Sequence, residues 1–411
     1  MDFKLEPEML TRKYEAAVEA HRIGDYVAAH REFQPLAEHG DLDAQHILAT
    51  MYGRGLGKPK NLVEAAKWWR KAADQGDAEA QFNLGLAYTY GRGVAHDYVE
   101  AEGWFRKSAE QGSDSAQFNL GLMYDRGMGM PRNVAEATKW WRRAAIQGNC
   151  NAQYSLGMLF MGRGETLDYD EAAKWHRMAA DQNNAGSQVT IGLMCETGMG
   201  MPLDQTEAAK WFQKAADQGL KEAQYHLGNS YFYGTGVAED YAEAAKWYGE
   251  AARKGYASAQ VNLGRMYQNG QGIAQDYIGA ANWFRKAADQ GEAEAANGIG
   301  LLYYSGRGVE EDHASAVKWF KIAAEKGVSD AQFRLGIAYS LGKGLPVDNV
   351  LAHMWLSIAD RQSDEDMTEA CKRVEIATKV LELLEERMTA AQIAEAEKLA
   401  REWKPKLPED S

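Results

Sequence analysis

Pairs of glycines separated by one residue are the first candidate for chemistry in this sequence. The motif occurs nine times, from Gly55/Gly57 near the start to Gly342/Gly344 near the end. A glycine-rich loop can cradle a phosphate, but a nucleotide site of that kind needs a β-strand before the glycines. Here apolar residues recur at spacings of three and four on both sides of each pair, which predicts helices. We therefore interpret the pairs as turns between helices, since glycine adopts positive φ without steric cost.

The other reactive residue types form no catalytic arrangement. The nine His are scattered, and no two of them lie at metal-ligand spacing beside a carboxylate. Cys150, Cys195 and Cys371 occupy unrelated positions, so we interpret them as free thiols. The Asp and Glu residues are explained as helix caps or solvated side chains. We expect no catalytic residue, no metal site and no cofactor, and we predict that the protein is not an enzyme.

The overall charge narrows the range of partners. The chain has 411 residues and a net charge of −13. This charge argues against a nucleic acid, whose binding depends on Lys and Arg that neutralise phosphates, and it mildly favours a basic protein partner. No stretch approaches the length of a membrane span, and the first residues do not resemble a signal peptide. We expect a cytoplasmic location, although a periplasmic protein whose signal peptide had been removed would look the same.

A column of tryptophans shows how the chain is organised. Nine of the twelve Trp follow one another at intervals of 36 residues, with one interval of 35: Trp68, Trp104, Trp140, Trp175, Trp211, Trp247, Trp283, Trp319 and Trp355. A fixed period of this size is typical of repeat proteins, in which each unit contacts mainly its neighbours. We therefore predict one elongated all-α solenoid.

Each repeat carries the same pattern of two helices. Asp or Asn opens the second helix in every repeat, as Asp97 does, and Glu follows three residues later in six of them. This pairing resembles a capping box. A glycine in the middle of the first helix, such as Gly85, predicts that a neighbouring helix crosses where there is no room for a Cβ. Trp104 and its equivalents are expected to fill the layer between helices.

The two ends depart from the period, as the ends of a solenoid must. We predict an N-terminal capping hairpin over residues 1–43, nine repeats over 44–361 and C-terminal capping helices over 362–411. The N-terminal hairpin is expected to contain helices at 13–22 and 27–37. Asp364 to Glu385 and the stretch after Thr389 read as the closing helices. The fourth repeat lacks one residue before Gly162, and we expect a tighter loop there.

The repeats share the pattern A-x-A-Q-x-x-L-G-x-x-Y-x-x-G-x-G-V-x-x-D-Y-x-E-A-x-x-W. This pattern resembles the Sel-one-like repeat family, a relative of the tetratricopeptide repeat. Ala80 to Gly112, Ala223 to Gly255 and Ala259 to Gly291 match it well. The resemblance implies an α/α superhelix of repeated antiparallel helical hairpins that serves as a scaffold or adaptor for other proteins, in signalling or at the cell envelope. The chain lacks the cysteine pair of the disulfide-rich bacterial members.

The resemblance also implies where a partner would bind, because first helices line the concave groove in tetratricopeptide proteins. The position after the conserved Gln holds Phe82, Phe118, Tyr154 and Tyr225. The position after the mid-helix glycine holds Leu86, Asn229 and Arg265. The position before the first loop glycine holds Tyr90, Arg126, Tyr233 and Asn269. Asn83, Asn119 and Asn262 stand where an amide can pair with the backbone of an extended peptide. Aromatic residues and Arg are frequent anchors of interfaces.

Alternatives remain open at this point. The aromatic residues could instead belong to the core, and the Asn amides could bond to an adjacent helix or to water. The primary hypothesis is a non-enzymatic scaffold that binds a protein or peptide in the concave groove. A protein that binds a small molecule or a cell-envelope glycan between aromatic side chains is the alternative, and a structural homodimer formed through an end cap is a third.

Overall fold

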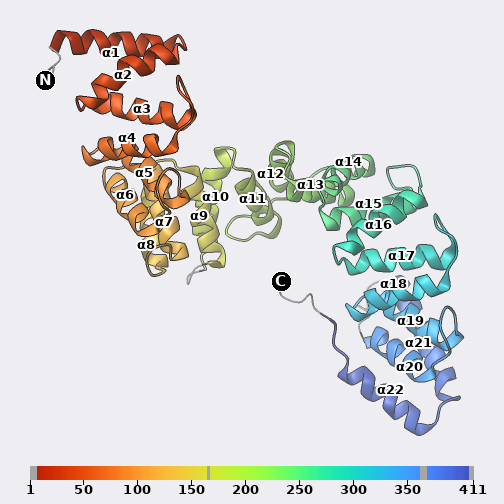
Figure 1. Ribbon diagram of the computed structural model, residues 1–411. Helices are drawn as coiled ribbons and strands as arrows, with labels where there is room; N and C mark the ends of the chain where they lie inside the picture. The colour runs from red at the N-terminus through yellow and green to blue at the C-terminus, as the bar shows by residue number, and fades with distance from the viewer. Residues whose placement is uncertain (1–6, 164–166, 362–367, 407–411) are drawn as a thin grey trace. The chain divides into compact units, whose positions relative to one another are not determined.

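The computed structural model of the protein describes residues 7–163, 167–361 and 368–406, and within these ranges every regular element is a helix (Figure 1). An N-terminal hairpin consists of α1 (Pro7–Arg22) and α2 (Tyr26–Glu38). The first helices of the nine repeats are α3 (Leu42–Arg54), α5 (Ala78–Tyr90), α7 (Asp114–Arg126), α9 (Cys150–Met158), α11 (Ala185–Thr197), α13 (Lys221–Tyr233), α15 (Ala257–Asn269), α17 (Ala293–Ser305) and α19 (Ser329–Leu341).

The second helices are α4 (Leu62–Asp74), α6 (Tyr98–Glu110), α8 (Val134–Ile146), α10 (Tyr169–Asp181), α12 (Gln205–Asp217), α14 (Tyr241–Arg253), α16 (Tyr277–Asp289), α18 (His313–Glu325) and α20 (Asn349–Arg361). The chain closes with α21 (Thr368–Glu385) and α22 (Ala390–Glu402). The prediction of an all-α solenoid of antiparallel hairpins is confirmed.

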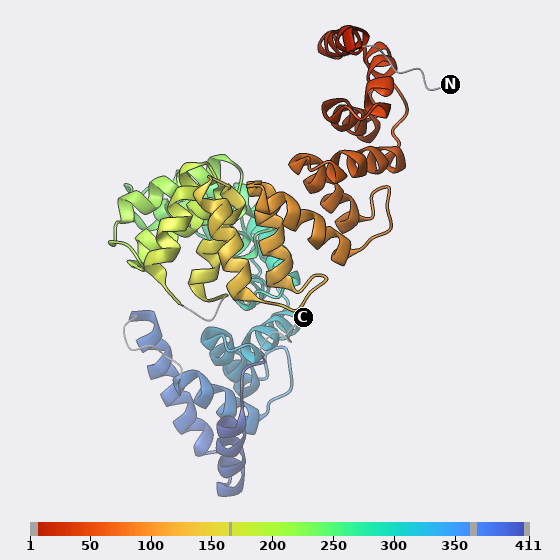
Figure 2. The same ribbon diagram turned by 90° about the vertical axis from the view of Figure 1, so that its left-hand side faces the viewer.

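The solenoid divides into two compact units, Met1–Pro202 and Leu203–Ser411. The division falls inside the fifth repeat, so α11 belongs to unit 1 and α12 to unit 2. Within each unit, successive helices lie side by side in chain order (Figure 2). Each unit is described by itself below.

The Asp or Asn that opens each second helix caps it as predicted. Asp97 Oδ1 accepts the backbone N–H groups of Val99 and Glu100 at 2.8 and 3.1 Å. The predicted return bond of a capping box is wrong for this helix, because the backbone N–H of Asp97 already donates to Tyr88 O of the first helix at 3.1 Å. The Glu100 carboxylate instead accepts a hydrogen bond from Trp104 Nε1 at 3.3 Å. The cap therefore joins the two helices of a repeat.

The glycine pairs are turns, and their second member also fixes how repeats stack. Gly91 ends α5 in the left-handed conformation with φ of 63°. Gly93 has φ of 77°, and a Cβ there would overlap the carbonyl oxygen of Leu62, the first residue of the preceding repeat's second helix. Each loop thus contacts the N-terminus of the preceding repeat's second helix, which aligns the loops along one edge of the unit.

The mid-helix glycines sit under a large side chain, as predicted. A Cβ on Gly121 would lie 2.5 Å from the Trp141 ring, and one on Gly85 would lie 2.7 Å from Phe105. The ring that occupies this space belongs to the residue after the periodic Trp. The periodic Trp104 itself is 6% exposed and packs with alanines of the preceding repeat's second helix. Two adjacent aromatic residues therefore fill the layers on both sides of the second helix.

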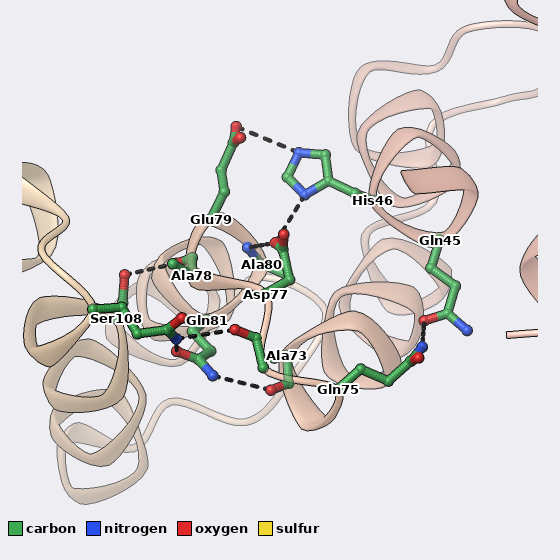
Figure 3. A network of polar contacts seen from close by, with 12 residues as sticks. Gln45, His46, Ala73, Gln75, Asp77, Ala78, Glu79, Ala80, Gln81 and Ser108 are labelled. Atoms are coloured by element: carbon green, nitrogen blue, oxygen red, sulfur yellow. Dashed lines mark hydrogen bonds and ion pairs between the residues drawn. The ribbon is translucent and has the colours of Figure 1, made fainter. Parts of the chain in front are cut away.

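Buried glutamines link three consecutive helices (Figure 3). Gln81 is 4% exposed, and its Nε2 donates to Ala73 O at the end of the preceding second helix, at 3.1 Å. Gln81 Oε1 accepts from Nε2 of Gln111, which ends the second helix of its own repeat, at 2.8 Å. Gln111 also donates to Gly76 O at 3.0 Å. Both polar ends of the buried amide are therefore satisfied, and the same ladder recurs along the solenoid.

The ends differ in detail from the predictions. The helix expected to begin at Lys13 begins at Pro7, and Pro suits a first helical position because its missing N–H would have no intrahelical partner. The capping box at Thr389 is confirmed at the start of α22. Residues 364–367 of the expected closing helix lie outside the described ranges. Trp403 packs edge-on against Trp355, at 6.0 Å between ring centroids, so α22 covers the last repeat.

The shortened fourth repeat changes its first helix. There, α9 continues into a π-helical turn, η1 (Leu159–Arg163), in which Gly162 has φ of 107°. The missing residue is thus accommodated at the helix end rather than in the loop alone. Residues 164–166 of that loop lie outside the described ranges.

Candidate protein-binding face

The aromatic residues after the conserved Gln pack within the protein. Phe82 is half-buried, 5.9 Å from the Phe105 ring, and Tyr154 lies 5.6 Å from His176. In unit 2, Tyr225 lies 5.0 Å from Tyr256, which precedes the next first helix. Phe118 is also half-buried. These rings contact the second helix of their own repeat or the start of the next repeat, so the core interpretation is favoured for this column.

A polar member of the same column, His46, shows that a side chain at this position reaches the next repeat. His46 Nε2 lies 3.4 Å from Glu79 Oε1 and its Nδ1 lies 3.4 Å from Asp77 Oδ1, both at the start of the next first helix (Figure 3). Asn297 repeats this geometry, since its Nδ2 donates to Asp330 Oδ2 at 3.0 Å. The position therefore bridges repeats.

Four of the five predicted Asn side chains have partners inside the protein, among them Asn269, whose Nδ2 donates to Gln271 Oε1 at 3.2 Å. Asn119 Nδ2 donates to Ser115 O of its own helix at 2.8 Å. Asn229 Oδ1 accepts from the Tyr248 hydroxyl at 2.7 Å, and Asn262 is hydrogen-bonded to the same hydroxyl. Burial raises the pKa of Tyr248, so the hydroxyl remains a donor at neutral pH. The alternative of bonding within the solenoid therefore holds for these amides.

Asn83 differs from the other amides. It is half-buried on α5, and its amide has no hydrogen-bond partner among the described residues. Asn83 and Leu86 line a cavity of about 480 Å³ between α3 and α5. Thr50, Gly53, Arg54, Lys60, Leu62, Trp69, Glu79, Ala87 and Arg92 complete the lining. An amide that can both donate and accept therefore faces an open space on the first-helix side of unit 1.

The remaining predicted positions lie at the surface. Tyr90 is 60% exposed and Tyr233 is 67% exposed, and Arg126 and Asn269 are exposed. Arg265 forms an ion pair with Glu294 of the next repeat at 2.9 Å. The predicted groove residues are divided between the two units, and two of them, Asn83 and Leu86, share one cavity.

Trp69 lines this cavity and was missed by the sequence analysis. It occupies the column of Phe105 and Trp141, which cover a mid-helix glycine, but the first repeat has Ala49 at that place. The Trp69 ring lies instead beside Gly53, one turn along α3, where a Cβ would be 3.5 Å from it. The sequence signal that could have identified Trp69 is Gly53, a glycine displaced by one helical turn from the usual mid-helix position. Trp69 Nε1 is buried without a hydrogen-bond partner among the residues that the structure describes.

Two properties of the titratable groups bear on chemistry in this part of the chain: the placement of possible metal ligands, and the lowered pKa of the buried His176. In the described residues, no group of three or more His, Cys, Asp and Glu is placed to hold a metal ion. His176 occupies the position in the fourth repeat that Phe105 occupies in the second. It is buried against Gly157, and burial lowers its pKa to about 4. Its Nδ1 lies 3.2 Å from Ser187 Oγ. His176 is thus a neutral packing residue. No helix of the described chain is long and apolar enough to cross a bilayer.

Known proteins share this architecture. The model of the Sel1 repeat matches nine consecutive segments: residues 42–77, 78–113, 114–149, 150–184, 187–220, 221–256, 257–292, 293–328 and 329–363. The chain belongs to the Sel1 repeat family. Sel1 repeat solenoids generally mediate protein–protein interactions and are generally non-catalytic.

Two solved Sel1 repeat structures are similar over much of the chain. One is c5321, a protective antigen of uropathogenic Escherichia coli strains with an SLR fold, which is 30% identical over 97% of this chain and 94% of that chain, with a TM-score of 0.67. The other is a Sel1 repeat protein from Oxalobacter formigenes, 33% identical over 74% of this chain and 88% of that chain, with a TM-score of 0.57. A search of curated proteins gave no significant match.

Proposed function

We propose that the protein is a non-enzymatic scaffold that binds a segment of a protein partner on the first-helix face of unit 1. The observation that supports this most directly is the cavity between α3 and α5, lined by Asn83 and Leu86. The other amides of the same type are occupied within the protein, whereas the Asn83 amide is left for a peptide group. The family's general role in protein–protein interaction agrees with this proposal.

The cavity is suited to one or two side chains of a larger ligand. Its volume of about 480 Å³ is in the range of small-molecule sites, but its lining holds four charged side chains beside four apolar ones, whereas small-molecule sites are mostly apolar. A peptide would place main-chain groups near Asn83 and an aliphatic stem against Leu86. The glycan alternative is not proposed, because the aromatic rings at the column of Phe82 and Tyr154 pack against protein.

Site-specific cross-linking tests the proposal. A photoreactive phenylalanine analogue at Leu86 should capture a partner in cells, whereas the same analogue at Ile146, which is 75% exposed at the end of α8, should not. Asn83→Ala should reduce the yield from Leu86. Asn119→Ala is the matched control, because that amide is already bonded to Ser115 O. Equal yields from the two labelled positions, or equal effects of the two Asn variants, would contradict the proposal.

A further inference from the structure

The loops of unit 1 carry an unusual charge for this acidic chain. In the first three repeats, the residue before the second-helix cap is Lys60, His96 or Arg132. In the sixth to eighth repeats, the same place holds Glu239, Gln275 and Glu311. The chain as a whole has a net charge of −13, so the basic residues at this place are a local feature of unit 1.

Stacking of the loops brings these charges to one edge. Gly57 sits against the backbone of Tyr26, Gly93 against Leu62 and Gly129 against Tyr98, so each loop is fixed on the helix of the preceding repeat. Arg54, Lys58, Lys60, Arg92, Arg126 and Arg132 therefore line successive loops, and all six are exposed. We call these six residues the basic edge.

In the part of the chain that the structure describes, most of the basic edge lacks an acidic partner. Arg132 lies 3.5 Å from Asp125, and Arg92 stacks on the Tyr90 ring at 4.8 Å. Among the described residues, no ion pair is formed by Arg54, Lys60 or Arg92. These three cations surround the cavity that contains Asn83.

The carboxylates near the cavity, those of Glu79 and Asp97, interact with other groups. Glu79 is the one carboxylate in the cavity lining, and its Oε1 lies 3.4 Å from His46 Nε2. Asp97 caps α6 through its carboxylate. Three cations and one partly engaged carboxylate therefore face the open space, and a neutral or basic ligand would leave the cations unpaired.

From this arrangement we infer that the basic edge and its cavity bind an acidic segment of the partner, in which Asp or Glu carboxylates lie against Arg54, Lys60 and Arg92. The inference rests on the proposed function and specifies the chemistry of the partner. It reverses the expectation of a basic partner drawn from net charge, because the field at a cleft depends on the charges that line it rather than on the total. Arginine favours this role, since its guanidinium can contact a carboxylate through two hydrogen bonds.

A labelled hexaglutamate peptide probes the inference on the full chain. Fluorescence anisotropy should show binding at about 50 mM salt that weakens as salt screens the exposed charges. The triple variant Arg54→Gln, Lys60→Gln, Arg92→Gln should bind about tenfold more weakly, since three exposed ion pairs are lost. The control triple Lys139→Gln, Lys210→Gln, Lys318→Gln removes the same charge from exposed positions on second helices and should bind within about twofold of the unmodified chain.

Three results would overturn the inference. The first is absence of hexaglutamate binding, and the second is an equal loss in both triple variants, which would indicate a response to net charge alone. The third is self-association of the chain that the first triple variant abolishes, which would assign the edge to a second copy. If Leu86 still cross-links a partner while hexaglutamate does not bind, the acidic ligand is wrong and the scaffold proposal stands. Circular dichroism of both variants checks that they fold.

Discussion

Replacement of Lys254 by Gln should stabilise unit 2, because it would complete a broken step of the glutamine ladder. Gln224 is 4% exposed, and its Nε2 donates to Ala216 O at 3.3 Å. Its Oε1 is buried and has no hydrogen-bond partner in the described part of the chain. In the intact steps, a Gln thirty residues later donates to this oxygen, but here that position holds Lys254, whose Nζ donates to Gly219 O at 2.6 Å.

The size of the effect depends on which hydrogen bonds the new side chain can form. A satisfied hydrogen bond contributes about 0.5–1.5 kcal/mol, and a buried acceptor without a partner costs about 1–3 kcal/mol. The hydrogen bond to Gly219 O need not be lost, because Gln111 donates at once to Gln81 Oε1 and to Gly76 O. We expect Lys254→Gln to raise the free energy of unfolding by about 1 kcal/mol, or the melting temperature by about 2–4 °C for a unit of this size.

Lys326→Gln is the matched control. Lys326 occupies the equivalent position and donates to Gly291 O at 2.7 Å, but the ladder position of its repeat holds Ala296, so there is no amide oxygen to satisfy. Urea unfolding of both variants, followed by circular dichroism, measures the difference. A similar gain in both would show that removal of a positive charge is responsible. Destabilisation by Lys254→Gln would refute the ladder explanation.

Other predictions concern buried groups and helix glycines. The pKa of about 4 for His176, against 6.5 in an unfolded chain, means that the unfolded state binds a proton between these values that the native state does not. Stability should therefore fall by up to about 3 kcal/mol as pH drops through that window, and His176→Phe should reduce the loss in urea titrations at pH 7.5 and 4.5. Gly121→Ala places a Cβ 2.5 Å from Trp141 and should destabilise the protein by about 1–3 kcal/mol. Gly103→Ala, in open space on α6, should stabilise it by about 0.5–1 kcal/mol, and thermal melts that rank the two alanine variants the other way would contradict the packing argument.

The repeat itself was predictable because its signals are redundant. The caps, loop glycines and mid-helix glycines recur in nearly every repeat, so each prediction was supported many times over. Predictions failed where they were drawn from the residue spacing within one helix and ignored its contacts with other helices. The predicted return bond to the Asp97 backbone is absent because that N–H is bonded to Tyr88 O, a contact between helices that local sequence spacing does not reveal.

The candidate site was less predictable for the same reason. A groove position defined by the period holds chemically similar residues in different environments. Asn83 and Asn119 share a column, yet Asn119 bonds to Ser115 O while Asn83 faces a cavity. The difference arises from neighbouring repeats, because Asn83 lies opposite α3, which departs from the pattern. Position in the repeat therefore did not predict which of these side chains pack within the protein and which are left without a partner among the described residues.

The departure in α3 explains why the cavity lies at the first junction. In later repeats, a mid-helix glycine admits the ring of the residue after the periodic Trp, as Gly85 admits Phe105. Ala49 closes that space in the first repeat, and Gly53 opens another one turn further along the helix, where the Trp69 ring lies. Because Gly53 has no side chain, the surface beside it stays hollow where the next repeat has Thr89. These two linked substitutions thus move a ring toward the first-helix face and leave room beside it, at the place where the basic edge begins.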